Sequence, residues 1–364
     1  MVINNNLCKL NEENYPIIED DKVCFVYRGK ADQVSVVGDF NDWEPVDNMI
    51  KLKSGDLWYL NKKVPRDARI DYKFIVDHDW ISDPLNKSIN NCHYSYNSTL
   101  IMPEYNNNFD LIRATNAPKG CLISKLKFES ISLGRSMNYK IYLPDGFKEE
   151  KINNFIYVID GNEYLDMGGM SSTIDYLIYK GYMPKSVVVL IDPGERTNEY
   201  KLNENYINYI KNELIPHIEN TYTLCRDYIQ RTVIGASWGG LTAMYIAMTT
   251  DNLINKVISQ SGTLWAKNWM IFDVISKVAQ KKIDICIQTG IKNETELMNY
   301  KMSNLLKSKG YNVIYQKFNE GDNWANWGNH LFDALKAVYE CQENEDSEDT
   351  EDFDETLYDL SYWG

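Results

Sequence analysis

A serine between small residues is the strongest chemical signal in this sequence. Ser237 is the centre of a G-x-S-x-G pattern within the segment RTVIGASWGGLTA, residues 231–243. An apolar run precedes the pattern and a helical pattern follows it, and a serine on a strained strand-to-helix turn exposes its hydroxyl as a nucleophile. We therefore predict that Ser237 attacks a carbonyl carbon in an acyl-transfer reaction.

An attacking serine also needs hydrogen-bond donors for the oxyanion that forms in the transition state. The backbone N–H of Trp238, the residue after the serine, is the first candidate. We expect the second from the turn after the apolar run FIYVID, where Asn162 follows Gly161. The N–H of Asn162 would then be the donor, and Gly161 would give the turn the backbone freedom it requires.

The sequence offers no pattern for a metal site or a nucleotide cofactor. It contains no H-E-x-x-H, no EF-hand spacing, no cluster of Cys and His, and no glycine-rich phosphate loop. We therefore expect no metal and no cofactor.

The acidic charge of the chain is concentrated near its C-terminus. The formal net charge is −14, and residues 343–359 hold ten Asp and Glu side chains, so the rest of the chain carries only −4. A nearly neutral body without a basic patch argues against nucleic acid as a partner. The tail 343–364 ends in aromatic residues and is either a solvated segment or one that docks on its own domain or on a partner.

Two further observations concern the compartment. No run approaches the roughly 18 consecutive apolar residues of a spanning helix, and the polar segment 1–21 lacks an apolar signal region. Seven cysteines are scattered without a C-x-x-C pair, an odd number that favours reduced thiols over a disulfide framework. We expect a cytoplasmic protein that has no membrane partner.

The elements that must position these residues change character along the chain. From Val23 to Ile101, apolar and polar residues alternate between hairpin-type turns, which predicts a small immunoglobulin-like β-sandwich. Beyond Cys121, short apolar runs alternate with helical patterns, which predicts an α/β fold with a parallel sheet of six or more strands. The expected strands are 155–159, 186–191, 232–234, 257–259, 283–288 and 312–316, and the expected helices include 203–219 and 331–339.

A length of 364 residues suits two such domains. We place the β-sandwich in residues 1–113, the α/β domain in 114–342 and the acidic tail in 343–364. Trp43, Trp58 and Trp80 of the sandwich either stack on a sugar or an aromatic ligand or fill the interior.

Sequence blocks in both domains resemble known families. In the first domain, VSVVGDFNDWEP at 34–45, GDLWYL at 55–60, YKFIVD at 72–77 and DPLN at 83–86 resemble the glycogen-binding-type early-set domains that precede many glycan-active enzymes and the enterochelin esterases. In the second domain, the blocks resemble the enterochelin (ferric-siderophore) esterases and their esterase D-like relatives. They are VIDGNEY at 158–164, IDPGERTNEY at 191–200, ELIP at 213–216, RTVIGASWGGL at 231–241, ISQSGTLW at 258–265 and EGDNWANW at 320–327.

This resemblance implies an α/β-hydrolase fold for the second domain and a small-molecule ester as substrate or ligand. It implies that Ser237 is the nucleophile and that Arg196 lines the substrate pocket. By the same resemblance, Trp324 and Trp327 flank the loop that carries the general base, and Trp265 of the block ISQSGTLW belongs to the substrate site.

The resemblance also implies a carboxylate that orients the base, placed after the apolar run IDICIQ at residues 283–288. Glu294 is the first candidate for this acid and Glu296 is the second. The alternative is a surface charge at the start of a helix, because acidic side chains are favourable at helix N-termini.

The histidine that the resemblance implies is absent from that loop. The family pattern is G-H-D-W-x-x-W, whereas here Gly321 is followed by Asp322 and Asn323. A carboxylate with the ordinary Asp pKa of about 3.9 has little driving force to take a serine proton, although burial beside another carboxylate raises such a pKa. Four explanations are open: a base from His330 or His93, Asp322 as an unusual base, a different reaction, or a binding protein derived from an esterase.

We therefore predict a serine carboxylic-ester hydrolase of the enterochelin-esterase-like group, altered by the missing histidine. Ser237, Asp322 and Glu294 form its catalytic set in this interpretation. The alternatives are a non-catalytic pseudo-esterase that binds a ligand, a partner or its own acidic tail, and a glycan-associated acyl esterase.

Overall fold

The computed structural model describes residues 15–53, 55–92, 95–147, 152–222 and 228–340. The chain forms two compact units. The first, called here the sandwich unit, comprises Met1–Leu111 together with Thr289–Lys292 and Lys317–Asn329. The second, the α/β unit, comprises Ile112–Gln288, Asn293–Gln316 and His330–Gly364. His93 and the acidic tail, whose docking the sequence left open, lie outside the described residues.

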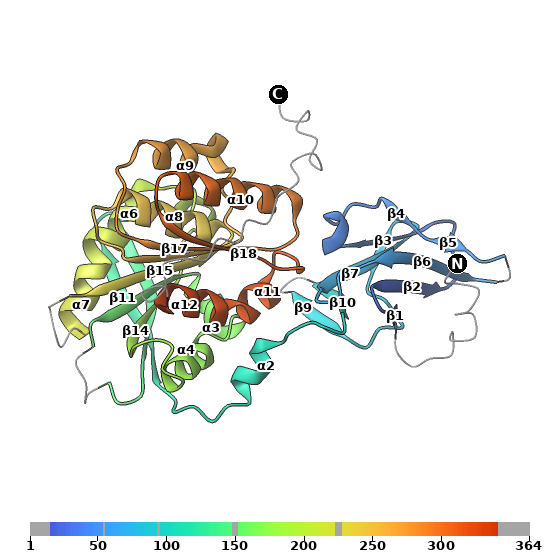
Figure 1. The fold of residues 1–364 in the computed structure, drawn as a ribbon, viewed down its shortest axis with the longest axis horizontal. Coiled ribbons are helices and arrows are strands. Elements are labelled where there is room, and N and C mark those ends of the chain that lie inside the picture. The colour runs from blue at the N-terminus through green and yellow to red at the C-terminus, as the bar shows by residue number, and fades with distance from the viewer. Residues whose placement is uncertain (1–14, 54, 93–94, 148–151, 223–227, 341–364) are drawn as a thin grey trace. The chain divides into compact units, whose positions relative to one another are not determined.

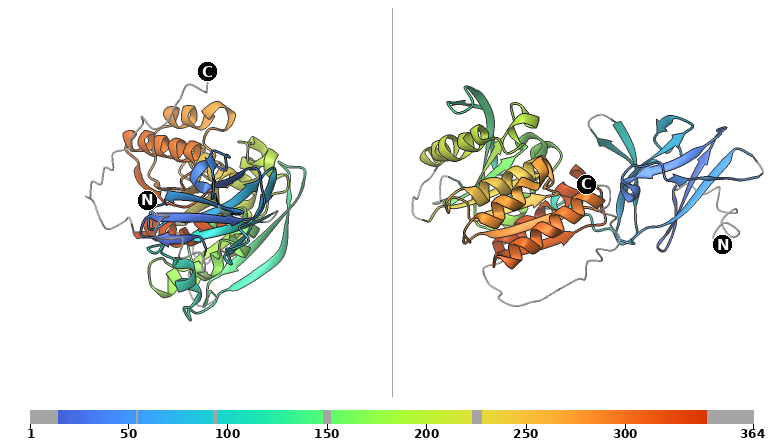
Figure 2. Two further views of the ribbon diagram at one scale, coloured as in Figure 1. Left: turned by 90° about the vertical axis from the view of Figure 1, so that its right-hand side faces the viewer. Right: turned by 90° about the horizontal axis from the view of Figure 1, so that it is seen from above.

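Two antiparallel sheets form the sandwich unit (Figure 1, Figure 2). The first sheet has the strand order β1 (Ile17–Glu19), β2 (Lys22–Arg28), β6 (Leu57–Lys63) and β5 (Ile50–Lys51). The second has the order β4 (Asp47–Asn48), β3 (Val34–Gly38), β7 (Arg69–Val76), β10 (Ser95–Ile101) and β9 (Ile89–Cys92), and β8 (Asp79–Ile81) also pairs with β7. A 3-10 turn, η2 (Asp39–Asn41), follows β3, and a short helix, α2 (Asn108–Arg113), follows β10.

The inward-facing side chains of these strands form the core of the sandwich unit. Phe25 of β2 and Tyr72 of β7 are fully buried, and their rings meet edge to face with centroids 4.9 Å apart. Trp58 is 5% exposed, so its ring belongs to the core and not to a ligand surface. Trp80 is half exposed, and its ring lies nearly parallel to that of Trp43. The β-sandwich predicted from the period-two pattern is confirmed.

The α/β unit is built on one eight-stranded sheet. Its order is β11 (Cys121–Ser130), β12 (Arg135–Leu143), β14 (Ser186–Ile191), β13 (Asn154–Ile159), β15 (Gln230–Ala236), β16 (Lys256–Gln260), β17 (Asp284–Thr289) and β18 (Asn312–Lys317). The pairs β11–β12 and β12–β14 are antiparallel, whereas the pairs from β14 through β17 are parallel.

Helices cover both faces of this sheet. The helices of the chain beyond β12 are α3 (Gly161–Asp166), α4 (Met170–Tyr179), α5 (Arg196–Glu199), α6 (Glu204–Asn208), the π-helical η3 (Tyr209–Leu214), α7 (Ile215–Tyr222), α8 (Trp238–Thr249), α9 (Ala266–Lys277), α10 (Asn293–Ser308), α11 (Trp324–Asn329) and α12 (Leu331–Glu340). One face carries α3, α4 and α12, and the other carries α8, α9 and α10 (Figure 1). Because helices cover both faces, every residue of β13 and of β14 is buried.

The elements predicted from the apolar runs are confirmed with small shifts at their ends. The helix expected over 203–219 is observed as α6, η3 and α7 in succession. Periodicity did not reveal the hairpin β11–β12, because most residues of β11 are exposed or half-buried and form no continuous apolar run. The predicted α/β-hydrolase arrangement, with a sandwich before it in the chain, is confirmed.

Three general features characterise the part of the chain that the structure describes. No helix there combines the length and the apolar character that crossing a bilayer requires. The same residues contain no group of three or more His, Cys, Asp or Glu side chains arranged to hold a metal ion. Cys24, Cys121 and Cys286 form no disulfide within the described residues.

A ladder of amide side chains joins three neighbouring strands of the α/β unit. Gln260 of β16 donates from Nε2 to Gln288 Oε1 of β17 (2.7 Å), and Gln288 Nε2 donates to Gln316 Oε1 of β18 (2.8 Å). Gln288 Nε2 also donates to the carbonyl of His330 (3.0 Å), and Gln260 accepts from the hydroxyl of Tyr164 (2.7 Å). The ladder thus connects α3 and the start of α12 to the strands.

Gln288→Leu removes the middle of this ladder. We expect the free energy of unfolding to fall by about 2 to 4 kcal/mol, because a donor on Gln260 and acceptors on Gln316 and His330 lose their partners in a dry environment. Chemical denaturation followed by circular dichroism measures the change. Gln316→Leu, at the half-buried end of the ladder, is the control and should cost less. Equal stability of wild type and Gln288→Leu would contradict this account.

Candidate active site

Ser237 occupies a strained turn between β15 and α8. Its backbone angles are φ 53° and ψ −120°, a region that residues with side chains rarely adopt and that costs of order 1–3 kcal/mol. Two hydrogen bonds hold this turn: the N–H of Ser237 donates to the carbonyl of Gln260 (2.8 Å), and the N–H of Thr263 donates to the carbonyl of Ser237 (3.1 Å). The neighbouring strand and loop therefore fix the strained conformation.

The glycines around Ser237 are required by space. A Cβ on Gly235 would lie 2.1 Å from the carbonyl oxygen of Gly239, so the end of β15 approaches the start of α8 too closely for a side chain at Gly235. A Cβ on Gly240 would lie 2.8 Å from Ser259 Oγ of the neighbouring strand β16. The close approach at Gly235 gives a physical reason for the first glycine of the G-x-S-x-G pattern.

The hydroxyl of Ser237 contacts another hydroxyl. Its Oγ lies 3.2 Å from Thr263 Oγ1, and within the described residues of the α/β unit it hydrogen-bonds to no imidazole and no carboxylate. His217 of this unit lies 3.3 Å from the hydroxyl of Tyr139. His330 places Nδ1 3.0 Å from Asp333 Oδ2, one helical turn along the chain. A hydrogen bond from His330 to Ser237, one explanation for the missing base, is therefore not observed.

Two backbone N–H groups are available at the edge of the sheet where Ser237 lies. β13 and β15 are parallel neighbours in which Val158 pairs with Ile234, so their carboxyl ends meet at one edge. Asn162 and Trp238 lie in the first turns of α3 and α8, which begin at those ends. N–H groups in the first turn of a helix have no acceptor within the helix. Both donors proposed from the sequence are thus available at this edge.

Asp160, directly before the turn that contains Asn162, is fully buried and paired with Arg196. Arg196 Nε and Nη2 donate to Asp160 Oδ1 and Oδ2 over 2.8 and 2.7 Å. Burial opposes the charge of Arg196, but its bonds to Asp160 and the attraction of that carboxylate raise its pKa, so the guanidinium stays charged. Arg196 is the residue expected to contact substrate. One edge of its guanidinium binds Asp160, and 41% of its side chain is exposed.

Lys140 supports the same turn from β12. Its Nζ contacts Asn162 Oδ1 and donates to Asp192 Oδ2 over 3.1 Å. A Cβ on Gly161 would lie 2.5 Å from the carbonyl carbon of Leu190, so the turn packs directly against β14. Sequence reasoning missed Lys140, because only the antiparallel pairing of β12 with β14 brings it to this edge.

Three glutamates of the α/β unit differ in burial. Glu294, the first choice for the orienting acid, is half-buried in the first turn of α10, whereas Glu296, the second choice, is 3% exposed. Glu163 of α3, which sequence reasoning passed over, is partly buried, and burial raises its pKa. Trp265 is half-buried, directly precedes α9 and packs against the core of the unit.

The loop expected to carry the general base belongs to the sandwich unit. It comprises Lys317–Asn329, and Asp322 Oδ1 accepts a hydrogen bond from the N–H of Gly290 (3.2 Å). The rings of Trp324 and Trp327 meet edge to face with centroids 5.0 Å apart, and Trp327 is 8% exposed. The two tryptophans expected to flank this loop therefore pack on each other.

Two family models match the chain. Residues 130–338, more than half of the chain, match the Esterase family, which is described as "Putative esterase". Residues 22–106 match the family described as the glycogen recognition site of AMP-activated protein kinase. The second match covers β2 to β10 of the β-sandwich.

Known proteins are similar to this chain at low sequence identity. The crystal structure of ferric enterobactin esterase from Salmonella typhimurium is similar with a TM-score of 0.73 and 18% identity, over 89% of this chain and 96% of that one. The uncharacterized protein YjcH of Bacillus subtilis is 23% identical over 236 residues, which are 60% of this chain and 98% of that protein. The iron(III) enterobactin esterase of Dickeya dadantii is 21% identical over 240 residues, 60% of this chain and 55% of that protein.

Arg196→Met tests the ion pair at this edge of the sheet. We expect the variant to be about 1 to 3 kcal/mol less stable than wild type at about pH 8, because it leaves the buried carboxylate of Asp160 without its cation. Denaturant titrations followed by circular dichroism measure the deficit. Arg196→Lys keeps the charge without the paired bonds and should be intermediate; a stability of Arg196→Met equal to that of wild type would contradict the pairing.

Proposed function

Because the chain belongs to the esterase family, as its match over residues 130–338 shows, we propose that it is a serine hydrolase that cleaves a carboxylic ester. One observation carries the proposal: Ser237 is held at φ 53° on the turn between β15 and α8, in the G-x-S-x-G setting of a nucleophile. Backbone strain of this size persists only where the surrounding structure enforces it, and such positions cluster at active sites.

In the proposed reaction, Ser237 Oγ forms a bond to the ester carbonyl carbon while a base takes the hydroxyl proton. The carbonyl oxygen becomes an oxyanion that accepts hydrogen bonds from the N–H groups of Trp238 and Asn162. Collapse of this intermediate breaks the bond to the alcohol oxygen, which receives the proton, and leaves the acyl group on Ser237. Water then attacks in the same way and releases the acid.

We assign the base to the loop Lys317–Asn329, with Asp322 in that role and Glu294 or Glu296 as the supporting acid. His217 contacts Tyr139, and His330 contacts Asp333. These contacts support a base other than the described histidines of the α/β unit. A carboxylate is a weaker base than an imidazole at neutral pH. The proposal therefore implies slow turnover.

For the substrate we propose an ester of the siderophore class. The relatives from Dickeya dadantii and Salmonella typhimurium are named as esterases of iron(III) or ferric enterobactin. The exposed part of Arg196, together with Trp265, Trp324 and Trp327, supplies the proposed contacts to it: aromatic rings offer flat apolar area, and the guanidinium binds carboxylate or phenolate oxygens.

A second candidate function is a non-catalytic protein that keeps the site for a ligand or a partner. The contact between the hydroxyls of Ser237 and Thr263 favours it, because neither group can serve as a base. Asp322 in the place of the family's histidine favours it as well. The two functions differ in whether Ser237 is a working nucleophile.

A fluorophosphonate probe distinguishes these functions. If Ser237 is activated, the probe should label the wild-type protein, and labelling of Ser237→Ala should be at least about 100-fold slower because the attacking oxygen is gone. Mass spectrometry identifies the labelled peptide. Ser276→Ala, which removes an exposed serine hydroxyl in α9, is the matched control and should label like wild type. An unlabelled wild type that still binds a ferric siderophore would support the non-catalytic function instead.

Asp322→His tests the assignment of the base. We expect its turnover of a p-nitrophenyl ester to exceed that of wild type by about 10²-fold at about pH 8, because an imidazole takes the serine proton more readily. Steady-state hydrolysis measures kcat and KM. The gain must disappear when Ser237→Ala is added. Unchanged turnover in Asp322→His would show that this position does not serve the serine.

A further inference from the structure

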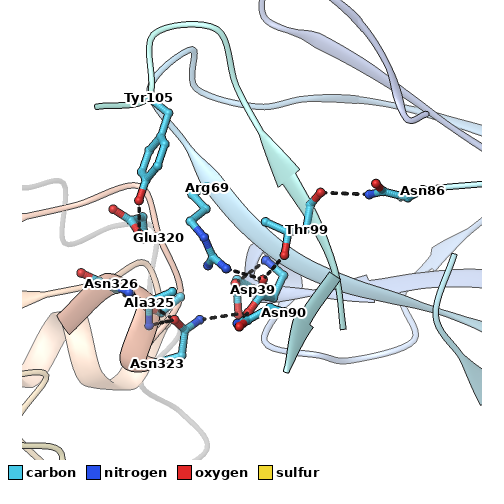
Figure 3. Close-up of polar contacts among 12 residues, drawn as sticks. Asp39, Arg69, Asn86, Asn90, Thr99, Tyr105, Glu320, Asn323, Ala325 and Asn326 are labelled. Carbon is cyan, nitrogen blue, oxygen red and sulfur yellow. Dashed lines mark hydrogen bonds and ion pairs between the residues drawn. The ribbon is translucent and has the colours of Figure 1, made fainter. Parts of the chain in front are cut away.

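The sandwich unit contains a cluster of charged side chains in its interior (Figure 3). Asp39, Arg69 and Asp71 are all buried, with 9%, 8% and 1% of their surface exposed. Asp39 Oδ2 accepts a hydrogen bond from the N–H of Asp71 (2.7 Å), and Arg69 Nη2 lies 3.1 Å from Asp71 Oδ1. Arg69 is therefore paired with Asp71, and Asp39 is bound to the backbone of Asp71, all three away from water.

Each carboxyl group of this cluster has further partners. Thr99 Oγ1 donates to Asp71 Oδ1 (2.9 Å), and Asn90 Nδ2 donates to Asp71 Oδ2 (2.7 Å; Figure 3). The indole N–H of Trp43 donates to Asp39 Oδ1 (3.1 Å). These partners come from β9, β10 and the segment after η2, so the cluster fixes several elements of the second sheet against one another.

The loop Lys317–Asn329 lies directly against the cluster. Asn323 Nδ2 is 3.5 Å from Asp71 Oδ2 (Figure 3). A Cβ on Gly321 would lie 2.2 Å from Asp39 Cγ, so the backbone of the loop touches this carboxyl group. The loop therefore contacts a carboxyl group on each side of Asp322. Gly321 contacts Asp39, and Asn323 contacts Asp71.

The strand that carries the cluster also pairs with the loop. The N–H of Arg69 donates to the carbonyl of Asn319 (3.1 Å), and Arg69 forms a parallel β-bridge with Glu320. The hydroxyl of Tyr105 donates to Glu320 Oε2 (3.4 Å; Figure 3). Backbone and side-chain contacts thus hold the loop at consecutive residues.

Asn323 links the cluster to the helix that follows. Its Oδ1 accepts hydrogen bonds from the N–H groups of Ala325 (3.0 Å) and Asn326 (3.3 Å), which satisfies the first turn of α11 (Figure 3). One amide therefore directs its nitrogen to Asp71 and its oxygen to α11. A shift of Asn323 would therefore change both its contact with Asp71 and its hydrogen bonds to the start of α11.

We propose that Asp39 and Asp71 are positioning residues for the loop that carries Asp322. They hold Gly321 on one side of Asp322 and Asn323 on the other, so they set the position of its carboxylate. An apolar core of similar volume is often at least as stable as buried ions, and a buried charged cluster is therefore better explained by the geometry it fixes. The role of the loop in hydrolysis rests on the proposed function, whereas its anchoring does not.

Asp39 gives this anchoring a pH dependence. Burial, and next the charge of Asp71, raise the pKa of Asp39 to about 7, against the opposing effects of the Asp71 N–H, Trp43 and Arg69. The loop also contributes the acidic Glu320, whose backbone forms the β-bridge with Arg69. A pKa raised in the folded state means that stability is greatest with the carboxyl protonated and declines as the pH rises from about 4 to about 7. The loop should therefore be held more tightly at about pH 6 than at about pH 8.5.

Hydrogen–deuterium exchange of the full-length protein tests the proposal. Asp71→Asn and Asn323→Asp should each speed exchange of peptides from 317–329 by about tenfold, which corresponds to a loss of about 1.4 kcal/mol of local stability. Asn323→Asp keeps the Oδ1 acceptor for α11 but turns a second carboxylate toward Asp71. Asp83→Asn changes a buried acid of the same unit that accepts from the Tyr72 hydroxyl, and its loop should exchange like that of wild type.

Asp39→Asn should abolish the pH dependence of loop exchange, after correction for the intrinsic rate, between about pH 6 and about pH 8.5. Equal loop exchange in wild type and Asn323→Asp, or an unchanged pH dependence in Asp39→Asn, would overturn the proposal. Near-UV circular dichroism establishes that each variant is folded, and Asn323→Asp provides the test from the loop side if a change within the sandwich core unfolds the protein. Because exchange needs no turnover, a wild type that fails to react with the serine probe but shows the anchoring would refute the hydrolase and leave this inference intact.

Discussion

The close crossing of β15 and α8 is the constraint on which the candidate site depends. Gly235 and Gly239 approach so closely that no Cβ fits between them, and the residue at the apex is forced to a positive φ. Ser237 therefore presents its hydroxyl at the carboxyl edge of the sheet, and the first turn of α8 presents the N–H of Trp238 at the same edge. A side chain at Gly235 would displace the start of α8 and disturb both features together.

Around this turn, the charged groups of the α/β unit are mainly structural. Arg196 pairs with Asp160, and Lys140 contacts Asn162. Both contacts stabilise the turn that follows β13. This arrangement keeps backbone donors in place without using a charged side chain for proton transfer. Among the described side chains of its unit, the hydroxyl of Ser237 hydrogen-bonds only to the hydroxyl of Thr263. The proposed hydrolysis therefore depends on which group acts as the base.

The β-sandwich contributes more than an apolar core. Two carboxyl groups in its interior, those of Asp39 and Asp71, contact the segment that follows β18. The buried cluster is costly in free energy, since each charge leaves water, but its hydrogen bonds are directional in a way that apolar packing is not. A loop held by directional bonds has one position, and the role proposed for Asp322 requires such a fixed position.

The sequence by itself determined the buried strands of the α/β unit and the turn that holds Ser237. The apolar runs mark buried strands, and the glycine spacing around Ser237 fits only a tight crossing, because both signals are local and sterically strict. Only the tertiary structure decided that Trp58 is a core residue, that Arg196 binds Asp160, and that residues 317–329 join the sandwich unit. The bond between Asp71 and Asn323 joins residues 252 positions apart, and no local pattern reports such a pair, since burial and hydrogen bonding arise only when distant segments meet.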